Sequence, residues 1–469
     1  MGRAVVIVAL LGGLGGTLAV RSSVTRAEEG ALAELEARRG PAPRVTWKNP
    51  GLEGWQPVFE ASPYRGPSAP PPGWTHLARP TRFRVPVFDT PEKPRSLIAR
   101  MRRGDVVPAR RADTSRHCHD LGERGTWWQI PDGYICSTSG YEIAQRLDRL
   151  DEPQRRPAVH RPLPFRYGHV TTKGAPRFSR RPTAAELAAT RNLARDSAVP
   201  AVVVERMWDD FFLALDRRVQ VGDEELFRTV YGEYVRAEDV RILETPPMRG
   251  EKLGGQVKLP LAFVYGADNS PLFCDDDERL VECGAAEKHA RFRPRARIER
   301  DGRTYLKGPQ GAYISSDRVR VARAIPLAPG ISSDERWIHV NLQNQTLVAY
   351  EGERPVYATL ISSGKETHAT PTGLYQVQRK FLTKIMRGND PKEGIYHVEE
   401  VPWTTYYYGA YALHGAYWHN TFGQVRSHGC TNVAPADARW LYYWGEPELR
   451  PQFHAEVNQR AMHIHFTDG

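Results

Sequence analysis

The chain has 469 residues, of which 40% are hydrophobic and 10% aromatic, so it can bury several cores and is not disordered throughout. Its length exceeds that of one ordinary domain and predicts about three or four folded units. The net charge of +10 suits a nucleic acid, an anionic membrane or a carboxylate-rich polymer. The arginines are scattered without a dense basic run or a nucleic-acid motif, which argues against a nucleic-acid partner.

The N-terminus predicts export. An apolar run from residue 4 to residue 20 follows Arg3, as in a secretory signal or an uncleaved membrane anchor. We therefore expect residues 1–27 to be a signal peptide or an N-terminal anchor in the inner membrane, and the protein to act in the periplasm or cell envelope. Cleavage stays open, because Ala27 is only a candidate end. Residues 28–82 are rich in Pro and Gly and predict a linker.

The five cysteines fit an oxidising compartment. Cys118 and Cys136 lie close in sequence, as do Cys274 and Cys283, whereas Cys430 has no near neighbour. Two local disulfides and one free thiol are the simplest arrangement.

Between the linker and residue 325 the sequence predicts two or three related small β units. A Gly-Tyr-Ile or similar aromatic strand end recurs near Tyr134, Tyr234 and Tyr313. We place the units at residues 83–150, 160–245 and 255–325. The order of strand, Gly-Asp turn and aromatic pair in the first unit resembles a bacterial SH3-like domain.

The second unit carries a predicted helical insertion. Thr183 and Glu186 form a capping box before a helix at 184–194. We assign the apolar residues that follow to the packed face of this insertion rather than to a cofactor pocket; they are Met207, Trp208, Phe211, Phe212 and Leu213. In the third unit the acidic run 275–278 lacks the alternating ligands and turn glycine of a calcium loop, so we expect a solvated loop.

A new composition begins at Trp337 and predicts an antiparallel β domain. Two short strands spanning 337–350 form a hairpin with its turn near Gln343 and Asn344. A strand at 356–364 and the Thr-Pro-Thr-Gly turn at 370–373 follow.

The run Ser427-His428-Gly429-Cys430-Thr431-Asn432 has the composition of a thiol active site, and His414-Gly415 lies sixteen residues upstream of Cys430. A thiolate is the reactive form of cysteine and needs a nearby base or positive charge. The glycine lets the backbone expose the sulfur and aim N–H groups at a developing oxyanion.

The opening hairpin, the Ser-Ser-Gly strand end, the Thr-Pro-Thr-Gly turn and this cysteine motif, in that order, resemble the L,D-transpeptidase family with a YkuD-type catalytic domain. The resemblance covers about residues 334–467. It implies a mainly β protein whose C-terminal β-rich catalytic domain follows two or three SH3-like units with a helical insertion. It also implies no cofactor and no metal.

The resemblance assigns roles to single residues. Cys430 becomes the nucleophile and His414 its general base, oriented by the backbone around Gly415. His428, Gly429 and Cys430 would line the oxyanion region. Ser427 and Asn432 would hold the loop through hydrogen bonds.

The implied substrates are peptidoglycan stem peptides, both as acyl donor and as amine acceptor, with carbapenems as expected inhibitors. Transfer to an amine would form a 3→3 cross-link. Water as acceptor would make the protein an L,D-carboxypeptidase, and the sequence leaves both open.

The aromatic stretch 386–411 allows two interpretations, a substrate lid and packing against the β core. A zinc peptidase is a weaker alternative, based on His414, His419, His428 and Cys430, because the usual ligand spacings are absent. We expect His454, His463 and His465 to be surface or strand residues. A papain-like peptidase would carry its cysteine early in the chain, and a non-catalytic wall-binding protein would not need an intact motif.

Overall fold

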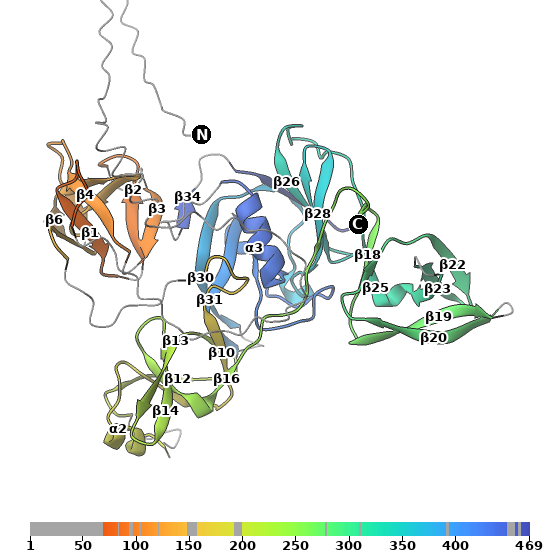
Figure 1. Ribbon diagram of the computed structural model, residues 1–469, viewed down its shortest axis with the longest axis horizontal. Coiled ribbons are helices and arrows are strands. Elements are labelled where there is room, and N and C mark those ends of the chain that lie inside the picture. Colours follow the sequence, from red (N-terminus) through yellow and green to blue (C-terminus); the bar gives the residue numbers. More distant parts are fainter. Residues whose placement is uncertain are drawn as a thin grey trace, which may run out of the picture.

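The computed structural model describes residues 69–82, 84–92, 97–102, 105–120, 122–147, 157–191, 199–276, 279–308, 311–390, 394–447, 455–457 and 461–469. The expected signal or anchor and most of the expected linker lie outside these residues, as does His454. The described chain is mainly β. Three small β units lie around a central C-terminal domain. In Figure 1 the first unit is at the left of this domain, the second is below it and the third is at its right. No helix among the described residues has the length and apolar character needed to span a membrane.

The first unit contains β1 (His76–Pro80), β2 (Arg84–Phe88), β3 (Leu97–Arg102), β4 (Val107–Arg111), β5 (Cys118–Asp120), β6 (Glu123–Gly125), β7 (Trp127–Ile130), β8 (Gly133–Cys136) and β9 (Tyr141–Ala144). Strand β1 pairs with both β4 and β9, so the unit begins inside the segment expected to be linker. Leu77 and Ala78 are fully buried, which explains why this short stretch is a strand. That boundary was wrong because a five-residue strand ending in proline shows little alternation.

The second unit contains β10 (Arg166–Val170), β11 (Ala175–Phe178), α2 (Ala184–Ala189), β12 (Val203–Met207), β13 (Phe211–Val221), β14 (Glu224–Thr229), β15 (Tyr234–Arg236), the 3-10 helix η1 (Ala237–Asp239) and β16 (Val240–Ile242). The capping box of Thr183 and Glu186 is present at the start of α2. The apolar residues assigned to the helical insertion lie instead on β12, on β13 and in the turn between them. Met207, Phe211 and Leu213 are buried there, in the core of the strands.

The third unit contains β18 (Leu261–Val264), β19 (Asn269–Asp276), β20 (Arg279–Glu287), β21 (Arg291–Phe292), β22 (Ala296–Arg300), β23 (Arg303–Lys307), β24 (Tyr313–Ser315), the 3-10 helix η2 (Ser316–Arg318) and β25 (Val319–Ala322). Disulfides join Cys118 to Cys136 in the first unit and Cys274 to Cys283 in the third. Cys430 is a free cysteine.

One pairing pattern repeats in all three units. The first strand pairs with the last, as β1 with β9, β10 with β16 and β18 with β25. The second strand pairs with the third, as β2 with β3, β11 with β12 and β19 with β20. The repetition is therefore topological. The SH3-like assignment and the other domain limits stay predictions.

The C-terminal domain contains β26 (Arg336–Asn341), β27 (Thr346–Glu351), β28 (Arg354–Ser362), the 3-10 helix η3 (Glu366–His368), β29 (Gly373–Gln376), β30 (Arg379–Asp390), β31 (Gly394–Tyr408), β32 (Tyr411–Gly415), β33 (Thr431–Val433), α3 (Pro435–Trp444), β34 (Ala455–Val457) and β35 (His463–Thr467). The expected hairpin is formed by β26 and β27. A two-residue strand before the third unit, β17 (Glu251–Lys252), adds to β28 from outside the expected domain.

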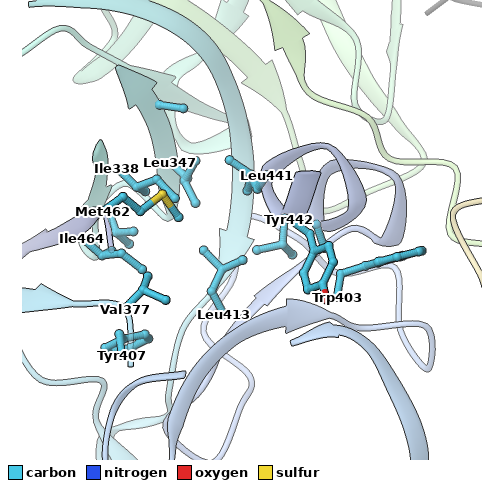
Figure 2. Packing of buried hydrophobic residues seen from close by; sticks show 14 of the residues in the cluster. Ile338, Leu347, Val377, Trp403, Tyr407, Leu413, Leu441, Tyr442, Met462 and Ile464 are labelled. Carbon is cyan, nitrogen blue, oxygen red and sulfur yellow. The ribbon is translucent and has the colours of Figure 1, made fainter. Parts of the chain in front are cut away.

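Two sheets of this domain meet at β28, which pairs with β27 on one side and with β33 on the other. Their shared core packs against α3. Figure 2 shows Leu441 and Tyr442 of α3 facing Leu413 and Trp403 of the sheet. The site motif lies next to this core, because Leu413 of β32 and Val433 of β33 belong to it.

Two buried glutamates attach the first and second units to β31. Glu399 pairs with Arg177 at 3.0 Å and accepts a hydrogen bond from the Ala214 N–H at 2.9 Å. Glu400 pairs with Arg84 of the first unit at 2.9 Å. Both glutamate side chains are 0% exposed, so protein groups replace water around their carboxyl groups.

The Glu399 junction predicts a pH dependence. Burial raises the carboxyl pKa of Glu399 from 4.5 to about 7, with Arg177 acting in the opposite direction. Because the folded state binds this proton more tightly than the unfolded chain, Glu399 stabilises the fold below about pH 4.5. That stabilisation is lost as the pH rises toward about 7. Relative to Glu399→Gln, the wild type should lose about 3 kcal/mol of unfolding free energy over this range.

Denaturant unfolding of both proteins across this pH range measures the difference. Glu225→Gln is the matched control, because Glu225 lies in an exposed ion pair with Arg218 of the same unit. A difference between wild type and Glu399→Gln that does not change with pH would contradict the assignment.

Candidate active site

The arrangement of the site comes from the parallel pairing of β32 with β33. In this register His414 lies opposite Asn432, and Leu413 lies opposite Thr431. Asn432 is also opposite Ser362 at the end of β28. Cys430 directly precedes β33, two residues before Asn432. The strand pairing therefore brings the expected base and the expected thiol to adjacent strands, although fifteen residues separate them in the chain.

The Cys430 side chain lies beside the start of β32. Its thiol donates a hydrogen bond to the Ala410 carbonyl at 3.7 Å. It packs against Phe381, Tyr406 and Ala412. Burial raises the pKa of the Cys430 thiol to about 11, and a hydrogen bond with the Ala412 backbone acts in the opposite direction. In this structure the thiol is therefore protonated at neutral pH.

The His414 imidazole is neutral at the same pH. Its residue is 2% exposed, and burial lowers its pKa to about 4, against a raising contribution from the Gly415 backbone. Gly415 lies on β32 opposite Val433, so it is part of the strand that carries the imidazole. A neutral imidazole can accept a proton, so His414 is in the protonation state that a general base needs.

Ser427 shapes the turn that presents Cys430. Its hydroxyl donates to the Cys430 carbonyl at 2.5 Å and accepts from the Gly429 N–H at 3.1 Å. Gly429 has φ +111°, and a Cβ there would lie 2.8 Å from the Tyr411 ring. Only glycine fits this position without strain. Since Ser427 already uses the Gly429 N–H, that donor does not face a substrate in this structure.

Asn432 and His428 lie on different sides of the motif. The Asn432 amide nitrogen is 2.9 Å from His419 Nε2, in the buried part of the site. The His428 side chain is exposed and stacks on Tyr396 of β31, with ring centroids 5.0 Å apart. Its ring also lies 5.3 Å from His368. The His428 imidazole therefore faces the β30–β31 hairpin. Its expected part in the oxyanion region falls to its backbone rather than to its side chain.

Thr370 also contributes to the site, although its sequence context predicts only a turn. Its hydroxyl accepts from the Gly364 N–H at 2.9 Å and donates to the Gly429 carbonyl at 2.7 Å. It therefore ties the Ser-Ser-Gly strand end to the cysteine turn. A threonine before proline in a predicted turn carries no signal for this contact, which spans 59 residues.

The stretch 386–411 belongs mostly to the core. Trp403 is fully buried, and its Nε1 donates to the Pro162 carbonyl at 2.6 Å. Tyr407 is also buried, whereas Tyr408 is 51% exposed. Tyr396 reaches the motif through His428. The packing interpretation holds for most of the stretch, and the lid interpretation stays a prediction for the hairpin around Tyr396.

The histidines of the described segments are each placed without a metal-site arrangement. Within the described ranges, no group of three or more His, Cys, Asp or Glu side chains is arranged to hold a metal ion. His419 is engaged with Asn432 and Thr421. His463 pairs with Glu335, and His465 lies on β35.

Thr370→Val keeps the shape of the side chain but leaves the Gly364 N–H and the Gly429 carbonyl unpaired in a buried position. We expect a loss of about 1–3 kcal/mol in unfolding free energy. We also expect slower alkylation of the Cys430 thiol by iodoacetamide. Thr370→Ser keeps the hydroxyl and should resemble the wild type. Equal behaviour of the two variants would show that the hydroxyl does not hold the turn.

Residues 335–450 match the family model described as YkuD, the L,D-transpeptidase catalytic domain. No curated protein matches the chain.

Several solved structures are similar to part of the chain. An L,D-transpeptidase from Stackebrandtia nassauensis is 19% identical over 29% of this chain and 57% of its own, with a TM-score of 0.21. An L,D-transpeptidase from Mycobacterium smegmatis is 18% identical over 36% of this chain and 79% of its own, with a TM-score of 0.23. LdtMt1, solved with imipenem, is 15% identical over 49% of this chain and 90% of its own, with a TM-score of 0.24. The chain thus spans little more than half of the first of these proteins. Residues 335–450 form a catalytic domain of the YkuD L,D-transpeptidase family.

Proposed function

We propose that this protein is a peptidoglycan L,D-transpeptidase in which Cys430 is the nucleophile and His414 is the general base. The observation that carries the proposal is the parallel register of β32 and β33, which places His414 level with Asn432 and next to the turn that holds Cys430. Cys430 is also the free cysteine, while the other four are paired. A free thiol and a buried neutral imidazole, carried by neighbouring segments of one sheet, have the composition that nucleophilic acyl transfer requires.

The proposed reaction starts from the neutral pair. His414 takes the thiol proton as the sulfur attacks a carbonyl carbon of a stem tetrapeptide. A C–S bond forms, and the carbonyl electrons move to the oxygen. When the tetrahedral species collapses, the C–N bond breaks and His414 returns the proton to the leaving D-amino acid. A thioester on Cys430 remains.

In the second step the amine of a neighbouring stem attacks the thioester, a C–N bond forms and the C–S bond breaks. His414 takes the proton from the amine and returns it to the Cys430 thiolate, which leaves the 3→3 cross-link and the starting thiol. Water as acceptor would give L,D-carboxypeptidase activity by the same route. For the oxyanion we propose the Cys430 N–H as the backbone donor, because the Gly429 N–H is bonded to Ser427. A non-catalytic wall-binding role is the third candidate, and it would leave Cys430 and His414 unused.

The pKa values bear on the timing of the reaction. Because the pKa of Cys430 is raised to about 11 and that of His414 is lowered to about 4, little thiolate exists before substrate arrives. We propose that the substrate displaces the thiol from the Ala410 carbonyl and that proton transfer accompanies attack. This arrangement protects the thiol from oxidation in an oxidising compartment, since the thiolate is the oxidisable form.

The setting of the reaction is also a proposal. Export to the periplasm or cell envelope, with anchoring through the N-terminus, would bring the enzyme to its polymer. The net charge of +10 suits a polymer that carries carboxylates. Neither a cofactor nor a nucleic acid has a part in this chemistry.

A carbapenem tests the nucleophile directly, because its strained lactam carbonyl is opened by a thiolate, and imipenem occupies one of the similar structures. The wild type incubated with imipenem should gain one mass equivalent, located on Cys430 by peptide mapping. Cys430→Ala should gain none, and His414→Gln should react at least about a hundredfold more slowly. An unmodified wild type, or an adduct that persists in Cys430→Ala, would contradict the proposal.

A further inference from the structure

The loop that joins the two halves of the site, residues 416–430, has no regular strand or helix of its own. Loops of this length inside a compact domain are usually functional and need contacts to hold one conformation. The C-terminal domain holds the middle of the loop. The Ser362 hydroxyl donates to the Thr421 carbonyl at 3.2 Å, and His419 contacts Asn432. The two ends of this middle segment are held by residues from outside the domain.

The third unit holds the loop at Gly423. Arg320 of β25 donates from Nε to the Gly423 carbonyl at 2.9 Å. The same guanidinium lies over the Tyr265 ring, 4.2 Å from its centroid. The Gly423 N–H donates to the Ile361 carbonyl of β28 at 2.8 Å. The C-terminal domain therefore bonds the N–H of Gly423, and the third unit bonds its carbonyl oxygen.

The contact at Gly423 is close enough to require glycine. Its φ is +95°, and a Cβ there would lie 2.9 Å from the Tyr265 Cβ. A larger residue would push the loop away from the third unit. Arg320 and Tyr265 thus contact the loop at Gly423, four residues before Ser427.

The second unit holds the loop at Tyr417 and Trp418. The Tyr167 ring stacks on the Tyr417 ring at 3.8 Å. Phe212 of β13 lies 6.3 Å from the Tyr417 ring and 6.2 Å from the Trp418 ring. Trp418 in turn lies 5.6 Å from the His414 imidazole. A chain of ring contacts therefore leads from the second unit to the expected base.

We propose that the second and third β units position the loop between His414 and Ser427, and that Arg320 is a positioning residue for Cys430. Arg320 touches neither substrate nor the reacting atoms. It acts by fixing Gly423, which fixes the approach to the Ser427 turn, while Phe212 fixes Trp418 beside His414. The role of these contacts in catalysis rests on the proposed function. Their effect on the reactivity of the Cys430 thiol can be measured without any substrate.

The experiment measures the rate at which iodoacetamide alkylates Cys430 in the full chain. Intact mass reports the extent of alkylation across a pH series. The other four cysteines are in disulfides, so alkylation reports on Cys430. Arg320→Ala should slow alkylation at neutral pH by about tenfold and move the pH profile upward, because small displacements between base and nucleophile are costly. Arg320→Lys keeps a cation over the Tyr265 ring and a donor for Gly423, so most of the lost rate should return.

Two further variants complete the comparison. Arg300→Ala is the matched control, since Arg300 is an exposed arginine on β22 of the same unit and donates a hydrogen bond to the neighbouring Glu299 carbonyl. It should react like the wild type. Phe212→Leu removes the ring contacts from the second unit and should slow alkylation in the same direction as Arg320→Ala. Thermal unfolding of each variant reports whether the change is confined to the site.

Wild-type rates and pH profiles in both Arg320→Ala and Phe212→Leu would overturn the inference. So would an equal loss in Arg300→Ala, or a failure of Arg320→Lys to recover any rate when all variants unfold at the same temperature. Failure of the proposed function looks different. In that case imipenem leaves the wild type unmodified, while the order of alkylation rates among the variants is unchanged.

Discussion

The parallel pairing of β32 with β33 is the constraint on which the site depends. It places His414 opposite Asn432, next to the turn that carries Cys430, and no short connection could do this, because parallel strands require a crossover. The chain therefore has to leave β32, travel through residues 416–430 and return to the same sheet. That crossover has no helix, so its shape depends on contacts with Ser362, with the second unit and with the third unit.

Burial shifts the pKa values of ionisable groups at two places in the structure. At the site it raises the pKa of Cys430 and lowers that of His414, so both groups are neutral at neutral pH. At the junction with the β units it raises the pKa of Glu399, although Arg177 opposes the effect. Both arrangements cost folding free energy. At the junction the buried glutamates join the units to β31, and at the site the neutral state of His414 is the one that the proposed general base requires.

Much of the fold followed from local patterns. The β26–β27 hairpin, the capping box of α2 and the pairing of neighbouring cysteines are all set by residues close in sequence. The cysteine motif and the order of the preceding strands led to the family of the C-terminal domain. The recurrence of strand ends across three units reflected a shared topology.

The remaining features depend on contacts between distant segments. Strand β1 was taken for linker because its burial comes from pairing with β4 and β9. Residues 207–213 were assigned to a helical insertion because a cluster of apolar residues has no clear period, and tertiary packing decided for strands. Thr370, Tyr396 and Arg320 bear on the site through partners 59, 32 and 103 residues away, and no local pattern marks such pairs.

The most direct test of the central claim is to mix the enzyme with a disaccharide stem tetrapeptide, quench with acid at short times and record the intact mass. The account predicts a transient acyl adduct on Cys430, with one equivalent of D-amino acid released for each adduct formed. A later appearance of cross-linked dimers or of free tripeptide would identify amine or water as the acceptor. Release of the D-amino acid by Cys430→Ala at the wild-type rate would contradict the account.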